Sequence, residues 1–220
     1  MDLDPQQRPG RVLSVNTGVP RVLIDHQGRQ WTTAILKSPV AGRVAVHGVN
    51  LEGDDQADRR VHGGPHKAVY AYAAADVAWW AAGMERELLP GAFGENLTVE
   101  GVDVSGAVVG ERWRVGTALL EISQPRIPCP KLGVAMGDPH FPRDFADAER
   151  PGAYLRIIEA GEIGAGDDIE RVAVPAHGLS VAEVFRAYRG RGDRGVAQRM
   201  VEVPELPQRW RDWARQHLSS

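Results

Sequence analysis

Most of the first 170 residues consist of short apolar segments, rich in β-branched residues and ended by glycine, proline or aspartate. Segments of this length and composition are typical of β-strands. Two pairs of them flank short turns and predict hairpins, at 22–25 with 30–35 and at 112–115 with 118–123. Further strands are predicted at 11–15, 43–46, 153–159 and 168–174, the last two separated by the glycine-rich stretch 161–166. Because regular helices do not alternate with these strands, the pattern favours a barrel or a sandwich over a doubly wound parallel sheet.

Helical signals are confined to two insertions and the C-terminal end. An alanine-rich stretch at 73–83 and a segment at 139–148 predict short helices. Ser180 followed by Glu183 is a capping box that begins a helix ending near Tyr188, and two more helices are predicted at 195–201 and 207–218. We therefore expect a mainly β protein: a β-barrel domain at 1–175 with short helical insertions, and a small C-terminal three-helix appendage at 176–220. A unit of roughly 40 residues rarely folds alone, so the appendage should pack on the barrel.

The charge balance argues against several classes of protein. The chain has 26 basic and 29 acidic residues, a formal net charge of −3, whereas proteins that bind phosphate backbones are usually basic. Arginines of the C-terminal helices alternate with acidic residues, which is typical of a solvated face. No apolar run reaches the roughly 18–20 residues that span a bilayer, and the N-terminal residues lack the apolar core of a signal peptide. With Cys129 as its single cysteine, the sequence predicts a cytoplasmic protein that binds neither nucleic acid nor membrane.

The first segment that could form a functional site surrounds Gly63-Gly64-Pro65. This sequence forces a tight turn whose backbone N–H groups can face an anion. Five basic side chains flank that turn: Arg59, Arg60, His62, His66 and Lys67. A glycine-rich loop with adjacent cations can cradle a phosphate, and the alternative is a solvated hairpin loop. His62 and His66 as a metal pair are disfavoured, because this loop does not present them on one helical face.

The second segment is Gly94-Glu95-Asn96, which leads into a predicted strand. It places a carboxylate and an amide at a loop–strand junction. An amide offers both a donor and an acceptor, so the pair can bond the edge of a purine-like or pterin-like ring. Ordinary turn chemistry is the alternative, and it is the better interpretation of this segment alone.

The third segment contains Cys129, which lies between two prolines at the start of a predicted short helix at 131–136. A helix N-terminus and nearby cations, here Arg126 and Lys131, favour the thiolate form of a cysteine. Such a sulfur can attack a substrate, carry sulfur or bind a soft metal ion. A buried structural cysteine is the alternative, and a Cys–His hydrolase is disfavoured because no strand-to-helix elbow accompanies this residue. Only three residues of the chain are lysines, so the positions of Lys67 and Lys131 in two of these segments are informative.

Together the segments resemble one known family. GDDQADRRVHGGPHKAVYAY, FGENLTVEG, VGERWRVGTALLEISQPR and PCPKL, in this order, are similar to the MOSC domain family, named after the C-terminal domain of molybdenum-cofactor sulfurases. The YiiM-like branch, which carries a C-terminal three-helix domain, is the most similar. The resemblance covers about residues 30–170 for the barrel and 180–218 for the helices. Pro130 departs from the pattern, because many relatives have an aromatic residue after the cysteine.

The resemblance implies a barrel of the pyruvate-kinase type that binds the molybdenum cofactor (molybdopterin), with Cys129 as the metal ligand. It also associates the domain with pyridoxal phosphate binding. By the same resemblance His62, Gly63, Gly64 and Lys67 help to hold the cofactor, and we add Arg60, Asn96, Arg126 and Lys131 for their charge or amide groups. Our mechanistic hypothesis takes Cys129, Asp58 and Glu95 as the catalytic residues, with the last two as proton donors; Asp54 and His62 are further candidates for that role.

The activity implied is the reduction of small N-hydroxylated compounds by N–O bond cleavage. A separate reductase would supply the electrons, because the sequence has no second cysteine for an iron–sulfur cluster and no dinucleotide fingerprint. If the protein assembles with itself, the expected form is a homodimer. Two alternatives stay open: a sulfur carrier that holds a persulfide on Cys129 without turnover, and a barrel that stores the cofactor. A nucleic-acid role for the C-terminal helices is disfavoured by their interleaved charges.

Overall fold

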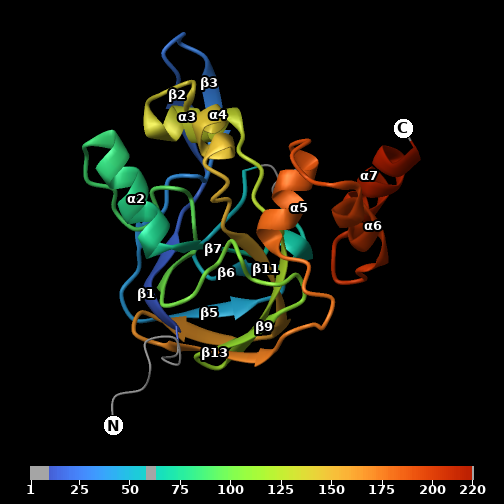
Figure 1. The fold of residues 1–220 in the computed structure, drawn as a ribbon. Helices are drawn as coiled ribbons and strands as arrows, with labels where there is room; N and C mark the ends of the chain where they lie inside the picture. The colour runs from blue at the N-terminus through green and yellow to red at the C-terminus, as the bar shows by residue number, and fades with distance from the viewer. Residues whose placement is uncertain (1–9, 58–62, 220) are drawn as a thin grey trace.

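The chain folds into a closed β-barrel, as the strand pattern predicts (Figure 1). The computed structural model describes residues 10–57 and 63–219. Seven strands form the ring in the order β13 (Asp168–Ala173), β9 (Arg112–Val115), β10 (Ala118–Pro125), β11 (Ala153–Glu159), β7 (Val69–Ala73), β8 (Leu97–Glu100) and β1 (Gly10–Thr17), and β1 closes it by pairing with β13. Neighbouring strands are antiparallel except β7 and β8, which run parallel.

Smaller sheets extend the barrel. The predicted hairpin at 22–35 is confirmed as β2 (Arg21–Ile24) and β3 (Gln30–Thr33). A three-stranded sheet pairs β12 (Gly161–Gly164) with β5 (Arg43–His47), and β5 with β6 (Asn50–Leu51). The two-residue strand β4 (Ser38–Pro39) pairs with the end of β1. We expected the stretch 161–166 to be only a connection between two strands, but most of it forms the strand β12.

Strand β10 forms the inner support of the molecule. All eight of its residues are buried, whereas β13 is mostly exposed. One face of β10 fills the barrel, and helix α5 (Val181–Tyr188) packs against the strand. Because the chain runs directly from the end of β10 into the cysteine segment, this buried strand sets the position of Cys129.

A second cluster of buried apolar residues lies where three helices meet one end of the barrel (Figure 1). The helices are α2 (Ala74–Met84), α3 (Pro130–Met136) and α4 (Phe141–Asp147), and a short 3-10 turn, η2 (Pro65–Lys67), precedes β7. The buried members are mostly aromatic: Tyr70, Tyr72, Val77, Trp80, Phe93, Leu132, Met136, Phe141 and Phe145. We call this set the aromatic cluster. It fixes α3, and with it the segment that carries the cysteine.

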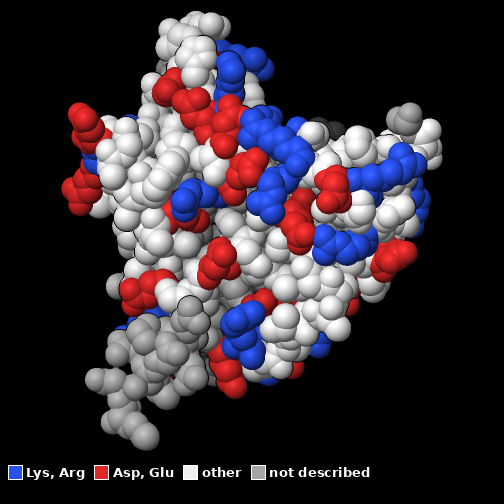
Figure 2. All heavy atoms as spheres, viewed as in Figure 1, with Lys and Arg blue, Asp and Glu red and all other residues white. Residues whose placement is uncertain are grey.

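The C-terminal appendage consists of α5, α6 (Arg194–Glu202) and α7 (Gln208–Ser219). Buried residues of all three helices belong to the same apolar cluster as the barrel interior, so the appendage packs on the barrel. Division of the chain at residues 175 and 176 remains a prediction. Figure 2 shows basic and acidic side chains interleaved over these helices, and Arg191 pairs with both Asp147 and Glu149 of the barrel domain. Within the described ranges, every helix is too short or too polar to cross a membrane.

The capping box at the start of α5 gives a test of how the appendage is held. The Ser180 hydroxyl accepts from the Glu183 N–H at 3.2 Å, and Glu183 accepts from the Ser180 N–H at 2.9 Å. We expect Ser180→Ala to lower the free energy of unfolding by about 1 kcal/mol, because the helix loses a partner for an N-terminal N–H group. Urea denaturation followed by circular dichroism measures the change. Ser219→Ala, in the last turn of α7, is the control and should differ little from wild type; equal loss in both variants would contradict the capping role.

Candidate functional site

A cavity of about 90 Å³ opens between the loops after β3 and β6, strand β7 and the segment that joins β10 to α3. Its lining is rich in polar groups: Thr33, Lys37, Asp54, Asp55, Gln56, Lys67, Tyr70, Asn96, Arg126, Cys129, Lys131 and Tyr154. All three lysines of the chain are among them. Among the residues that the structure describes, four basic side chains and two acidic ones line the cavity, which suits it to an anionic ligand.

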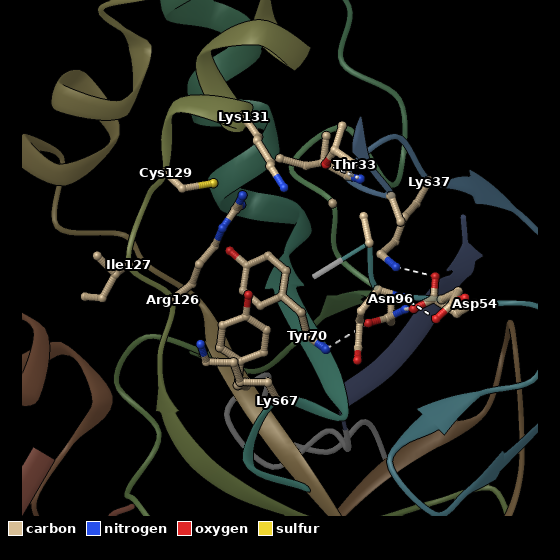
Figure 3. Close-up of a pocket in the computed structure, with 17 residues that line it drawn as sticks. Thr33, Lys37, Asp54, Lys67, Tyr70, Asn96, Arg126, Ile127, Cys129 and Lys131 are labelled. Carbon is tan, nitrogen blue, oxygen red and sulfur yellow. Dashed lines mark hydrogen bonds and ion pairs between the residues drawn. The ribbon is translucent and has the colours of Figure 1, made fainter. Parts of the chain in front are cut away.

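Cys129 is half-buried and lines this cavity, so its sulfur is open to a bound ligand (Figure 3). Its backbone is extended, and it is the N-cap residue of α3, with Pro130 as the first helical residue. The predicted helix start is therefore confirmed. Arg126 and Lys131 come from the same segment, and the structure brings both to the cavity with the thiol. The alternative of a sealed structural cysteine does not fit this exposure.

Arg126 forms the base of the cavity and is only 5% exposed. One Nη atom donates to the carbonyl oxygen of Phe93. The guanidinium carbon lies 5.1 Å from the ring centre of Tyr70 and 5.5 Å from that of Phe145. These partners are neutral, so they leave the positive charge of Arg126 uncompensated toward the cavity.

On the far side of the cavity, Lys37 forms a buried ion pair with Asp54 (Figure 3). Asp54 also accepts from the backbone N–H of Gly18 at 2.8 Å and from the Asn96 amide at 3.0 Å. Burial lowers the pKa of Lys37, and the charge of Asp54 opposes that shift. Asn96 accepts in turn from the Tyr70 N–H at 3.0 Å, so it positions the ion pair against β7. Binding of a cofactor by Asn96 remains a prediction.

Glu95 does not line the cavity; it is fully buried behind it. Its carboxylate accepts from the N–H groups of Gly91 at 2.7 Å and Phe93 at 3.0 Å, and from the Thr98 hydroxyl at 2.9 Å. Burial raises the pKa of Glu95. These contacts hold the loop that carries Asn96, and a role of Glu95 as a proton donor remains a prediction. Gly94 in the same loop has a φ of +75°, and a Cβ there would lie 2.9 Å from the Ile35 side chain.

The glycine-rich segment reaches the cavity through Lys67. Gly64, with a φ of +91°, precedes η2, and the turn places Lys67 in the cavity wall, whereas Gly63 and Gly64 themselves do not line it. Burial and the charge of Arg209 lower the pKa of Lys67 to about 8. His66 lies outside the cavity, with Ser123 Oγ 3.5 Å from its Nδ1. The predicted residues Asp58, Arg59, Arg60 and His62 lie outside the described residues.

Sequence reasoning missed Lys37, Tyr70 and Tyr154 as members of this site. Tyr70 and Tyr154 come from neighbouring strands, and their rings lie 5.1 Å apart beside Arg126. Burial raises the pKa of Tyr70, so its hydroxyl stays protonated and donates to the Pro151 carbonyl at 2.8 Å. The scarcity of lysine was the available signal for Lys37, because the other two lysines already mark the site.

The cavity places one thiol beside several cations, a combination that could hold an anionic group carrying a soft metal. In the described part of the chain, no three His, Cys, Asp or Glu side chains lie close enough to hold a metal ion together. Within these residues, Cys129 is the one sulfur that could bind a metal at this cavity. Lys37, Lys67, Lys131 and Arg126 supply the positive charge that such an anionic group needs.

Comparisons with known proteins identify the family to which the sequence is similar. The profile of the MOSC domain matches residues 58–170. The uncharacterized protein YflK of Bacillus subtilis is 34% identical, over 91% of this chain and 90% of its own length. Protein YiiM of Escherichia coli is 33% identical over 64% of each chain. A protein from Gibberella moniliformis named "Reductase" is 32% identical over 87% of this chain, which spans only 34% of that protein.

The fold has a similar solved counterpart. The crystal structure of YiiM from Geobacillus stearothermophilus has a TM-score of 0.78 and 29% sequence identity, and the match covers 96% of this chain and 100% of that one. Because the match extends over nearly the whole chain, it includes both the barrel and the C-terminal helices.

The charge state of Lys67 gives a test of the anion-binding cavity. With a pKa of about 8, its ammonium is present below that pH and is lost above it. We expect the metal-free protein to bind sulfate severalfold more weakly as the pH rises through 8, because sulfate keeps its charge over this range while Lys67 does not. Calorimetry is carried out on the Cys129→Ser variant, so that the thiol makes no contribution to the measured binding. Lys67→Arg should bind sulfate without this loss, and a loss of equal size in Lys67→Arg would contradict the assignment.

Proposed function

Because the chain belongs to the MOSC domain family, we propose that it binds the molybdenum cofactor at Cys129 and reduces N-hydroxylated compounds with electrons from a separate donor protein. One observation carries the proposal. The only cysteine of the chain is half-buried at a cavity that gathers every lysine of the sequence and the buried Arg126.

The residues present fit this cofactor. Cys129 offers the soft sulfur ligand that molybdenum accepts, and Lys67, Lys131 and Arg126 suit the phosphate and the other negative charges of the pterin. Asn96 and the Lys37–Asp54 pair offer polar groups on the opposite wall. When bound, the cofactor supplies two-electron redox chemistry at its metal. Asp58, Arg60 and His62 remain proposed members of the site, outside the described residues.

The proposed reaction converts R–NH–OH, two electrons and two protons into R–NH2 and water. The electrons come from the donor protein, and the N–O bond breaks. The chain's own residues must hold the substrate beside Cys129 and deliver protons to the departing oxygen. Lys67 is suited to hold a proton there, because its pKa of about 8 keeps its Nζ protonated but readily titratable near neutral pH. Glu95, by contrast, would have to release its three hydrogen-bond donors to act as an acid.

The dependence on an external electron donor is supported by the cysteine count. The sequence given has one cysteine, which is too few for a cysteine-ligated iron–sulfur cluster. In this proposal the electrons therefore come from a separate partner.

A half-buried cysteine among cations also suits a persulfide, so sulfur transfer without turnover is the competing function. One preparation separates the two. The protein is produced in a host that makes the molybdenum cofactor, and metal, pterin and the mass of the Cys129 peptide are measured. Arg143→Gln, at an exposed position on α4, is the matched control.

We expect about one molybdenum and one pterin per chain in wild type and Arg143→Gln, and loss of both in Cys129→Ser, because the serine hydroxyl is a poor ligand for a soft metal. The loaded protein should then oxidise a reduced dye with benzamidoxime as the substrate. Persulfide on Cys129 without metal would favour the carrier and contradict the reductase. Bound molybdenum without turnover would favour cofactor storage.

A further inference from the structure

A second cavity, of about 370 Å³, lies on the other side of the cysteine segment and is closed by the C-terminal helices. Four residues line both cavities: Lys67, Ile127, Cys129 and Tyr154. The thiol therefore stands at the boundary between a polar cavity within the barrel domain and a larger cavity that the appendage completes. A volume of this size is typical of sites for small molecules.

The walls of the second cavity are largely aromatic and apolar. Helices α5 and α7 contribute Tyr188, Trp210 and Trp213. The Tyr188 ring lies 5.4 Å from that of Trp213, and it remains 43% exposed although it is a large aromatic residue. Pro125 and Pro128 form part of the opposite wall. Flat aromatic surfaces and rigid prolines accommodate a planar ring better than a flexible aliphatic chain.

The charges of this cavity have one sign. Arg209 and Lys67 line it, and no acidic side chain does so among the residues that the structure describes. Arg209 is anchored, because its guanidinium donates to Gln124 Oε1 at 2.6 Å, and the Trp210 indole N–H donates to the same oxygen at 2.7 Å. The two cations lie close enough for Arg209 to disfavour the charged form of Lys67. A bound anion would relieve that repulsion.

We propose that this second cavity is the substrate half of the site, and that it selects a flat aromatic compound with an acidic substituent. The ring would lie against Tyr188 and Trp213, and the acidic group would bind Arg209 and Lys67. This places the N-hydroxylated group of the substrate at Cys129, on the boundary that the two cavities share. The inference deepens the proposed function and rests on it for the chemistry, whereas the binding step depends only on residues of this chain.

The test uses the full-length, metal-free protein, so that binding is measured independently of cofactor and turnover. Isothermal calorimetry compares benzamidoxime, its 4-carboxy derivative and the 4-carboxy derivative of the cyclohexane analogue. Wild type should bind 4-carboxybenzamidoxime about tenfold more tightly than benzamidoxime, the gain expected of a charge-assisted hydrogen bond. The aromatic acid should also bind more tightly than the cyclohexane acid.

Two variants separate the parts of the proposal. Arg209→Gln should remove most of the preference for the acidic ligand and leave neutral benzamidoxime within about twofold of wild type. Arg215→Gln, an exposed arginine of the same helix outside the cavity, should retain the preference. Tyr188→Leu should weaken both aromatic ligands and leave the cyclohexane acid unchanged, and Tyr188→Phe should restore binding, because it keeps the ring. Circular dichroism confirms that each variant is folded.

An unchanged preference for the acid in Arg209→Gln, or equal loss for all three ligands in Tyr188→Leu, would overturn the proposal. The outcome is also distinct from that of the metal analysis. Ligand selectivity as described, in a protein that never loads molybdenum, would support the binding half-site and defeat the reductase. Conversely, a molybdenum-loaded, active protein whose ligand affinities are unchanged in Arg209→Gln and Tyr188→Leu would support the reductase and exclude the second cavity as the substrate site.

Discussion

The arrangement of the site depends on one buried cation, Arg126. Withdrawal of a guanidinium from water is costly unless hydrogen bonds and rings take over its solvation. Here the Phe93 carbonyl and the rings of Tyr70 and Phe145 do so. These partners come from the loop before β8, from β7 and from α4, so one side chain holds together three elements that are distant in sequence. None of these partners is negatively charged, and Lys67 and Lys131 add further positive charge to the cavity that holds the thiol.

Closure of the barrel explains why two cavities meet at Cys129. Strand β10 is buried between the barrel interior and α5, and its last residues lead into the cysteine segment. Gln124, near the end of that strand, donates to the His66 carbonyl at 2.8 Å and accepts from Arg209 and Trp210. One amide thus links the turn that carries Lys67 to helix α7. Helix α7 is thus bonded to the end of β10, in agreement with the expectation that the appendage packs on the barrel.

Local signals in the sequence were sufficient for much of the fold. Short apolar segments marked β1, β5 and β11, a hairpin turn marked β9, and the capping box marked α5, because these elements are specified by neighbours in the chain. Strand β7 escaped prediction, since its sequence VYAYA continues into an alanine-rich helix without a turn signal. The cysteine with Arg126 and Lys131 was found for the same local reason. Lys37, Tyr154 and Arg209 were not, because only closure of the barrel and docking of α7 bring them to Cys129. Asn96 was found in the correct loop, but its contacts with Asp54 and Tyr70 arise from tertiary structure.

The concentration of every lysine at one cavity has a practical consequence. Reagents that acylate or reductively alkylate primary amines will form adducts, apart from the terminal amine, only with groups that line this cavity. The number of modified lysines in the folded protein thus reports whether the cavity is occupied. A guest that covers Lys67 and Lys131 shields them from the reagent, and intact-mass spectra will count the protected amines without any engineered label.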